Sequence, residues 1–191
     1  MRYIILAIVL LQFSPLSVAE NTIQLEEKAK NLATQLGMQL KAQLKNAIEA
    51  GGPSSAIPTC NVIAPQIADE LSSDGWKVGR TSLKLRNPSN SPDAWEHSTL
   101  LAFEQQLTEG TSAANLQKST IESSHGVTQY RYMKAIPIND VCLACHGDNI
   151  AKDVQSMLAE KYPLDAATGY KLGELRGAFT ISKILTNDSR D

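Results

Sequence analysis

Cysteine and aromatic residues are scarce in this chain. Among its 191 residues there are three cysteines, and aromatic residues make up 5%. So few cysteines argue against a small domain held together by several disulfides, and so few aromatic side chains argue against a platform that stacks nucleobases. The formal net charge is -2, the pI is near 5.9, and no run of lysine or arginine occurs. Nucleic-acid binding therefore has no electrostatic basis in this sequence.

Long apolar runs are also missing, apart from one at the N-terminus. Residues 4–11 are continuously apolar, they follow Arg2, and Ser17-Val18-Ala19 has the small-x-small pattern of a cleavage site. These features are typical of a secretory signal peptide, and the run is short for a membrane span. We therefore predict a signal peptide over residues 1–19 and one domain over residues 20–191. The expected location is periplasmic or secreted, without stable membrane insertion.

The first half of the remaining chain has the apolar periodicity of helices. Gaps of three and four between apolar residues predict a helix over residues 23–50, which Gly51-Gly52-Pro53 ends. A second helix is predicted over residues 54–71, and Pro65 should kink or end it because proline lacks the backbone N–H. After the Asp74-Gly75 turn, residues 76–86 are rich in Val, Thr and Leu and predict a strand.

The second half mixes strands with short helices. A helix is predicted over residues 92–107, with Ser91 as its N-cap and Gly110 after its end. Residues 121–124 and 127–136 predict a hairpin that turns at His125-Gly126. Residues 137–146 predict a loop or a short helical turn, residues 154–162 a helix that Pro163 stops, and residues 177–185 a last strand. The predicted fold class is α+β, an antiparallel sheet with N-terminal helices.

The most specific motif is Cys142-Leu143-Ala144-Cys145-His146. This C-x-x-C-H pattern is the attachment signature of c-type haem. Two cysteines three positions apart can form thioethers with the two vinyl groups of the porphyrin, and the adjacent histidine can bind the iron. This attachment takes place in an export compartment, which agrees with the predicted signal peptide. The sequence therefore predicts one covalently attached haem c held by Cys142, Cys145 and His146.

Two other interpretations of the C-x-x-C pair deserve comparison. A thioredoxin-like redox pair would follow a strand and open a helix within a βαβ unit, and no such unit is predicted here. A structural zinc site would need four ligands, but the sequence has no second C-x-x-C and no H-x₃₋₅-H pattern. The adjacent histidine favours haem over both.

A second axial ligand could come from several positions. The candidates are Cys60, Met133, Met38, Met157, His97 and His125. Cys60 is the one cysteine that the porphyrin would not use, and it lies on the apolar face of the second predicted helix, where a thiolate could reach ferric iron. Equally, it could be an inert buried cysteine. Met133, on a predicted strand, is the next candidate, although methionine there is more often part of the core.

Three basic residues alternate along the predicted strand 76–86. Arg80, Lys84 and Arg86 would lie on one face of that strand, where they could pair with the two haem propionates. They could equally form a solvated strand face.

Several further segments resemble one known family, the secreted single-haem c-type proteins with a PAS-like fold, long catalogued as a domain of unknown function in proteobacteria and cyanobacteria. The resemblance spans residues 25–185. It rests on AIPTC at residues 56–60, APQIA at 64–68, GRTSLKLRNPSNSPD at 79–93, YMKAIP at 132–137, CLACH at 142–146 and LRGAF at 175–179. The resemblance implies an axial pair made of the motif histidine and a cysteine on an N-terminal helix, which here is Cys60.

Two functions agree with these observations. The first is a redox-responsive or gas-responsive sensory module, which would need a separate redox or signalling protein as its partner because the chain has no output domain. The alternative is an electron-transfer cytochrome of low potential, since an anionic sulfur ligand stabilises ferric iron. An enzyme would need an open iron site beside an acid–base group. Nothing in the spacing of His97 or Arg86 requires one, so we expect no enzymatic activity.

Overall fold

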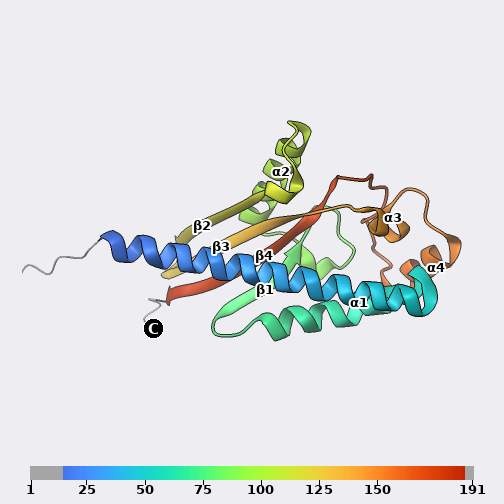
Figure 1. Ribbon diagram of the computed structural model, residues 1–191, viewed down its shortest axis with the longest axis horizontal. Coiled ribbons are helices and arrows are strands. Elements are labelled where there is room, and N and C mark those ends of the chain that lie inside the picture. Colours follow the sequence, from blue (N-terminus) through green and yellow to red (C-terminus); the bar gives the residue numbers. More distant parts are fainter. Residues whose placement is uncertain (1–14, 188–191) are drawn as a thin grey trace, which may run out of the picture.

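The computed structural model describes residues 15–187, so most of the predicted signal peptide lies outside the described residues. The elements follow the chain as helices and then a sheet with inserted helices (Figure 1). They are α1 (Pro15–Leu71), β1 (Trp76–Thr81), η1 (Pro88–Asn90), α2 (Ala94–Thr108), η2 (Ala113–Asn115), β2 (Gln117–Ser124), β3 (Val127–Pro137), α3 (Asp140–His146), α4 (Lys152–Lys161) and β4 (Leu175–Asn187).

Helix α1 consists of two helical segments that meet at a sharp break. Gly51 (φ −159°, ψ 19°) and Gly52 (φ 80°, ψ −179°) leave the helical region, and the positive φ of Gly52 suits a residue without a Cβ. The predicted break is therefore confirmed. Pro65 does not end the second segment, which continues to Leu71 with Pro65 inside it; a kink at Pro65 stays a prediction. Pro58 and Pro65 lie on its exposed side, where a carbonyl left without an N–H partner can bind water.

Four strands form one antiparallel sheet in the order β1-β4-β3-β2, which confirms the α+β class. The hairpin between β2 and β3 turns at His125 and Gly126 as predicted. Both residues have positive φ, 50° and 77°, as a two-residue hairpin turn requires.

Strand β1 is shorter than predicted. It ends at Thr81, next to Gly177 of β4, where a side-chain Cβ would overlap the Thr81 carbonyl oxygen. The chain then leaves the sheet, and the Ser82 hydroxyl donates to the Lys84 carbonyl at 2.7 Å in a local turn. The predicted alternation of Arg80, Lys84 and Arg86 on one strand face is therefore wrong, because only Arg80 lies on the strand.

The N-cap of α2 also differs from the prediction. Asp93, and not Ser91, caps the helix: its carboxylate accepts from the Glu96 amide at 2.9 Å, and the Glu96 carboxylate accepts from the Asp93 amide at 3.1 Å. This reciprocal capping box satisfies two amides that would otherwise have no partner. Ser91 instead ends the short η1 turn, donating its amide to the Pro88 carbonyl.

The two faces of the sheet pack against different helices (Figure 1). The first segment of α1 covers one face, where Leu32 and Leu36 belong to one cluster with Tyr132 and Ile181. Helix α2 covers part of the other face, where its Leu100 and Phe103 belong to one buried cluster with Met133 of β3. No helix within residues 15–187 is both long enough and apolar enough to cross a membrane.

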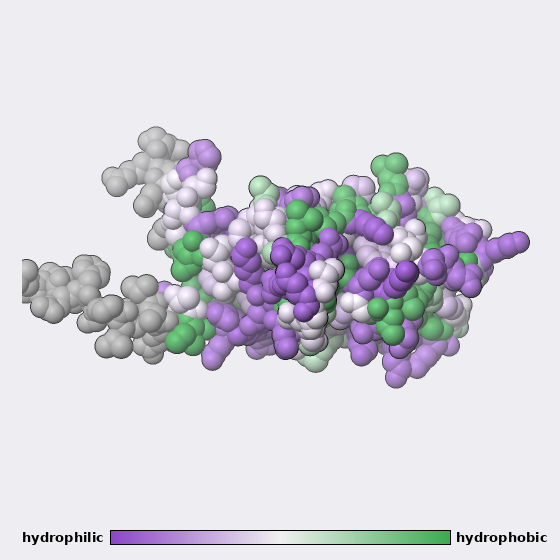
Figure 2. Space-filling model, turned by 90° about the horizontal axis from the view of Figure 1, so that it is seen from above, coloured by the Kyte–Doolittle hydropathy of each residue, from purple (hydrophilic) through white to green (hydrophobic). Residues whose placement is uncertain are grey.

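Beyond the sheet, α3 and α4 pack against the second segment of α1. Ile57 of α1 belongs to one buried cluster with Val154, Leu158 and Tyr162. Figure 1 shows this end of the molecule at the bend of α1, away from the β2–β3 hairpin. Apolar and polar residues are interleaved on the face that Figure 2 shows, with only small separate apolar groups.

Candidate functional site

The C-x-x-C-H motif forms the C-terminal part of α3. For this region the sequence predicted a loop or a short helical turn, and the structure has the helical turn. Cys142 and Cys145 lie three positions apart, so their side chains project from neighbouring positions on one side of the helix. Both thiols are free and half-buried. Cys142 packs against Ile138, Ala167 and Tyr170, whereas Cys145 packs against the α1–α4 cluster. The motif therefore bridges two parts of the core.

His146 is held in one orientation by the backbone. Its Nδ1 lies 2.7 Å from the carbonyl oxygen of Ala167, and only a protonated Nδ1 can donate to that carbonyl. Burial lowers the pKa of His146 to about 3, and the cations of Arg176 and Arg86 act in the same direction. The ring is therefore neutral, and its Nε2 keeps a lone pair. A backbone carbonyl on one ring nitrogen is the usual arrangement of a metal-binding histidine, and the other nitrogen, Nε2, has only a long contact of 3.5 Å with Nε of Arg176.

Cys60 is brought close to the motif by the second segment of α1. Burial raises the pKa of its thiol, while the nearby guanidinium groups of Arg80 and Arg86 act in the opposite direction. Cys60 also raises the pKa of Cys145, so the two sulfur atoms are electrostatic neighbours although 85 positions separate them in the sequence. The structure thus brings Cys60, Cys145 and His146 to one end of the fold, and the role of Cys60 as a ligand stays a prediction.

Arg86 ties two loops together. Its Nη2 lies 2.9 Å from the Asp165 carboxylate and donates to the Cys145 carbonyl at 2.6 Å. Asp165 in turn accepts from the Ala167 amide at 2.8 Å. Because Ala167 holds His146, this ion pair fixes the loop that orients the imidazole.

Arg80 and Arg176 complete a cluster of three guanidinium groups. Burial lowers the pKa of both, and Arg176 is lowered further by the charges of Arg86 and Arg80. Nη1 of Arg176 donates to the Ser82 hydroxyl at 2.7 Å, and Nε of Arg176 lies 3.5 Å from Nε2 of His146. The charge alternation in the sequence missed Arg176. The only signal for it was its place in the LRGAF segment of the family resemblance.

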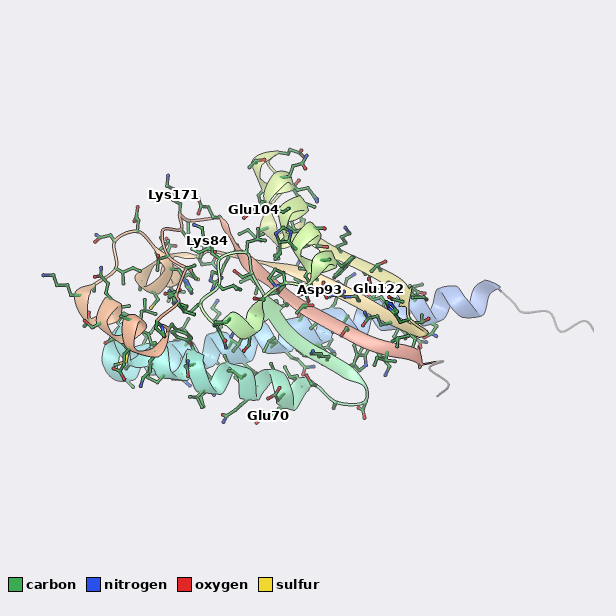
Figure 3. All side chains as sticks on the ribbon, turned by 180° about the vertical axis from the view of Figure 1, so that it is seen from behind. Glu70, Lys84, Asp93, Glu104, Glu122 and Lys171 are labelled. Atoms are coloured by element: carbon green, nitrogen blue, oxygen red, sulfur yellow. The ribbon has the colours of Figure 1, made fainter. Side chains whose placement is uncertain are left out.

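Lys84 does not join this cluster. It is exposed, and its Nζ lies 4.6 Å from the centre of the Tyr170 ring. Figure 3 shows Lys84 near Lys171, on the outside of this end of the molecule.

The other candidate axial ligands lie in different surroundings. Met133 is fully buried beneath α2 with Leu100 and Phe103, which is the core position that strand methionine usually has. Met38, His97 and His125 are exposed. Met157 packs against the same cluster as Cys145. Of the six candidates, Cys60 and Met157 are therefore the ones near the motif.

Two hollows border the C-terminal end of α3. One, of about 550 Å³, includes Gly147, Tyr162 and Asp165 in its lining, and the other, of about 360 Å³, includes Leu143 and Tyr170. Within residues 15–187, no group of three or more His, Cys, Asp or Glu side chains could hold a bare metal ion. The four ligands that a zinc site would need are thus not assembled in that range.

Comparison with known proteins places these features in a family. No curated protein matches the chain. Among solved structures, the cyanobacterial heme-protein Tll0287 matches with a TM-score of 0.56 and 22% sequence identity, over 92% of this chain and 99% of that chain, and this likeness concerns the fold. The model of the Tll0287-like family matches residues 19–183. This chain therefore belongs to the Tll0287-like family, which confirms the family resemblance seen in its sequence.

Proposed function

We propose that this chain is a c-type haem protein that carries one covalently attached haem. The observation on which the proposal rests is the presentation of His146, whose Nδ1 is held by the Ala167 carbonyl so that Nε2 is the nitrogen left for iron. Two free thiols, Cys142 and Cys145, precede it on the same short helix. The description of the cyanobacterial relative Tll0287 as a heme-protein supports the same cofactor.

The residues at this end of the fold fit haem c. Cys142 and Cys145 would form the two thioether bonds and His146 would be one axial ligand. Cys60 would be the second, because it is the remaining thiol and is an electrostatic neighbour of Cys145. A bound metal deprotonates a thiol outright, so the raised pKa of Cys60 does not oppose this role. Bound haem would supply an iron that changes between the ferric and ferrous states.

The role that we propose for this haem is sensory. An antiparallel sheet with helices on its faces agrees with a PAS-like fold, and PAS-like domains commonly report the state of a cofactor. This part of the proposal is an analogy at the level of the fold. The protein would respond to redox state or to a gas in the periplasm, or outside the cell, after a signal peptide over residues 1–19 is removed. A redox or signalling protein would be its partner. If His146 and Cys60 both bound the iron, they would leave no open position for enzymatic catalysis.

Electron transfer is the alternative function. It is favoured by the same pair of ligand candidates, His146 and Cys60, since an iron with two protein ligands exchanges electrons without exchanging ligands. Thiolate ligation would give this cytochrome a low potential.

Covalent attachment is tested by expression in the periplasm with cytochrome c maturation factors. We expect the mass of the purified protein to exceed that of the chain by one haem, and the haem to resist extraction with acidified acetone. The double variant Cys142→Ala Cys145→Ala should lose it, while Cys60→Ser should keep it as the matched control. Extractable or absent haem in the wild-type protein would overturn the proposal.

The second axial ligand is tested by comparing Cys60→Ser with Met133→Leu. Loss of an anionic ligand disfavours ferric iron more than ferrous iron. Cys60→Ser should therefore shift the Soret band and raise the midpoint potential, with the haem still attached. Met133→Leu should leave the spectrum unchanged, because Met133 is packed beneath α2. The opposite result would identify a His/Met cytochrome and favour electron transfer.

The two functions are separated by spectra of the ferrous protein with and without CO. A sulfur ligand that CO displaces readily supports the sensory role. A spectrum that CO does not change supports electron transfer.

A further inference from the structure

Positive charge is in excess at the proposed haem site. Arg80 lies near the end of β1, opposite Phe179 of β4, and Arg176 reaches the Ser82 hydroxyl just beyond that end at 2.7 Å. Arg86 donates to the Cys145 carbonyl at 2.6 Å, and all three guanidinium groups act electrostatically on His146. Only one of them, Arg86, has a carboxylate partner, Asp165, and both side chains of that pair are about nine-tenths buried. The neutral imidazole of His146 adds no charge. Two guanidinium charges are therefore left without an anion.

Neither Arg80 nor Arg176 has a carboxylate of its own, because the Asp165 carboxylate, which acts electrostatically on Arg176, is paired with Arg86. Arg176 makes its hydrogen bonds to neutral groups, the Ser82 hydroxyl at 2.7 Å and the Lys84 carbonyl at 3.2 Å, and lies near Nε2 of His146. Arg80 pairs with Phe179 of β4 through its backbone, but in the part of the chain that the structure describes its side chain makes no hydrogen bond or ion pair. Cys60 and Tyr162 are among the electrostatic neighbours of its guanidinium group. Partly buried charges without partners are costly, which indicates that this cluster is built to receive anions.

We propose that Arg80 and Arg176 bind the two haem propionates, which are carboxylates on one edge of the porphyrin. They would thereby determine how the porphyrin is oriented. This inference rests on the proposed function. The charges agree with it, because two propionates match the two unbalanced guanidinium groups. The single positive charge of a ferric porphyrin core would in turn match the Cys60 thiolate. Guanidinium groups suit this task because each can donate two parallel hydrogen bonds to a carboxylate.

The contacts of the two other basic residues predicted for the propionates favour this role less. Arg86 is committed to Asp165 and to the carbonyls of Cys145 and Ala167. Lys84 is exposed over the Tyr170 ring. Arg176, by contrast, contacts neutral groups: its Nη1 donates to the Ser82 hydroxyl, its Nε lies 3.5 Å from His146 Nε2, and its guanidinium group lies 5.7 Å from the centre of the Tyr170 ring. Its positive charge would therefore be available to a carboxylate.

The experiment compares the holoprotein, with its haem verified by mass, and the variants Arg80→Gln, Arg176→Gln and Lys84→Gln. The readout is the propionate bending mode in the resonance Raman spectrum, which reports hydrogen bonds to the propionates and which a purely structural role would not move. We expect this mode to shift in Arg80→Gln and in Arg176→Gln, and to stay unchanged in Lys84→Gln. The midpoint potential should fall in both arginine variants, because a cation near the iron is removed.

Conservative variants guard against loss of folding. Arg176→Lys and Arg80→Lys keep the charge and should return the potential toward the wild-type value, with only part of the vibrational shift, since lysine donates as a single point. Unchanged propionate modes in Arg80→Gln and Arg176→Gln, with haem still attached, would overturn the inference and leave the proposed function intact. Wild-type protein without covalent haem would overturn the proposed function itself.

Discussion

His146 illustrates how a site residue is prepared by its immediate neighbours. The Ala167 carbonyl selects the tautomer with hydrogen on Nδ1, and burial beside Arg176 and Arg86 keeps the ring uncharged down to a pKa of about 3. A neutral imidazole whose Nε2 carries a lone pair is the form that binds a metal. The same features make the protein without haem sensitive to acid, because an unfolded chain would protonate this ring at its ordinary pKa near 6.5.

We therefore expect the haem-free protein to lose stability as the pH falls. Between pH 6.5 and pH 3 the unfolded state binds a proton that the folded state does not, so the free energy of unfolding decreases in that window. The loss approaches about 5 kcal/mol at its lower end. Urea unfolding of the haem-free protein at several pH values measures this dependence.

His146→Gln should flatten the pH dependence, because glutamine does not titrate. His97→Gln, on the exposed side of α2, is the matched control and should keep the wild-type slope. An equal slope in wild type and His146→Gln would show that other groups cause the acid sensitivity.

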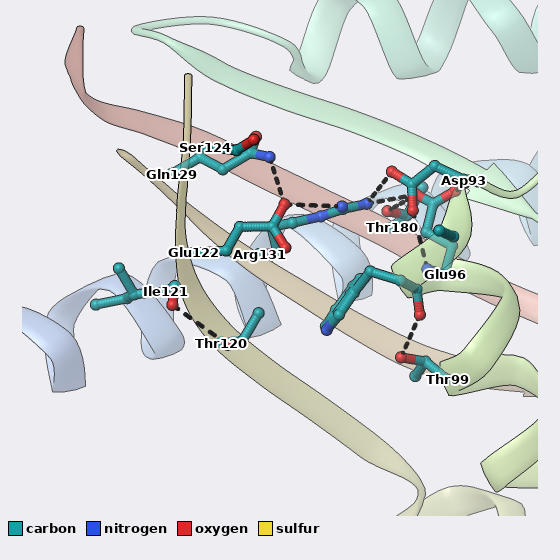
Figure 4. A network of polar contacts seen from close by, with 12 residues as sticks. Asp93, Glu96, Thr99, Thr120, Ile121, Glu122, Ser124, Gln129, Arg131 and Thr180 are labelled. Carbon is teal, nitrogen blue, oxygen red and sulfur yellow. Dashed lines mark hydrogen bonds and ion pairs between the residues drawn. The ribbon is translucent and has the colours of Figure 1, made fainter. Parts of the chain in front are cut away.

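At the scale of elements, the start of α2 is fixed by a network rather than by a single cap. The Asp93 carboxylate caps the helix and pairs with Arg131 at 2.5 Å, and Arg131 also pairs with Glu96 at 3.4 Å and Glu122 at 3.1 Å (Figure 4). Glu96 further accepts from the Thr180 hydroxyl at 2.6 Å. This network joins α2 to β2, β3 and β4, so the cap of one helix also connects it to the sheet.

Asp93→Ala should reduce the free energy of unfolding by about 2 kcal/mol, at the upper end for a helix N-cap, because the Arg131 pair is lost with it. Ser91→Ala, at the position that the sequence alone suggests as the cap, should change it by less than about 0.5 kcal/mol. Thermal or urea unfolding of both variants gives the comparison. Equal losses would contradict the assignment of Asp93 as the cap.

At the scale of the whole molecule, the close contact of β1 with β4 brings distant residues to the site. Gly177 (φ +157°) has no room for a Cβ beside the Thr81 carbonyl and Ser82. The residue before it, Arg176, reaches Ser82 and His146 from this point. The strand contact therefore sets the position of one guanidinium group relative to the imidazole.

Gly177→Ala should destabilise the fold by about 2–3 kcal/mol, because the new methyl group pushes β1 away from β4. Gly79→Ala on β1 is the matched control: its Cβ would meet only a Thr180 methyl group at 3.6 Å, so a change below about 1 kcal/mol is expected. The midpoints of urea unfolding measure both changes. A Gly177→Ala variant as stable as wild type would show that the strands yield at no cost.

Features that depend on neighbouring residues could be predicted from the sequence. The motif residues Cys142, Cys145 and His146 are close together in the sequence. The hairpin turn is formed by His125-Gly126, and the break of α1 is formed by Gly51 and Gly52. Each of these depends on local spacing or backbone freedom. The α+β class followed in the same way, because apolar periodicity identified the helices and most of the strands.

Features that depend on contacts between distant residues were decided only by the tertiary structure. Gly177 permits the close contact of β4 with the end of β1, the cap of α2 is stabilised by Arg131, and the orientation of His146 is set by a carbonyl 21 positions away. Arg86, predicted to face the propionates, meets Asp165, 79 positions further along, and Arg176, which the charge alternation did not include, lies beside His146. No local pattern encodes such pairs, because the free energy of each depends on burial and on a partner that only the folded chain brings near.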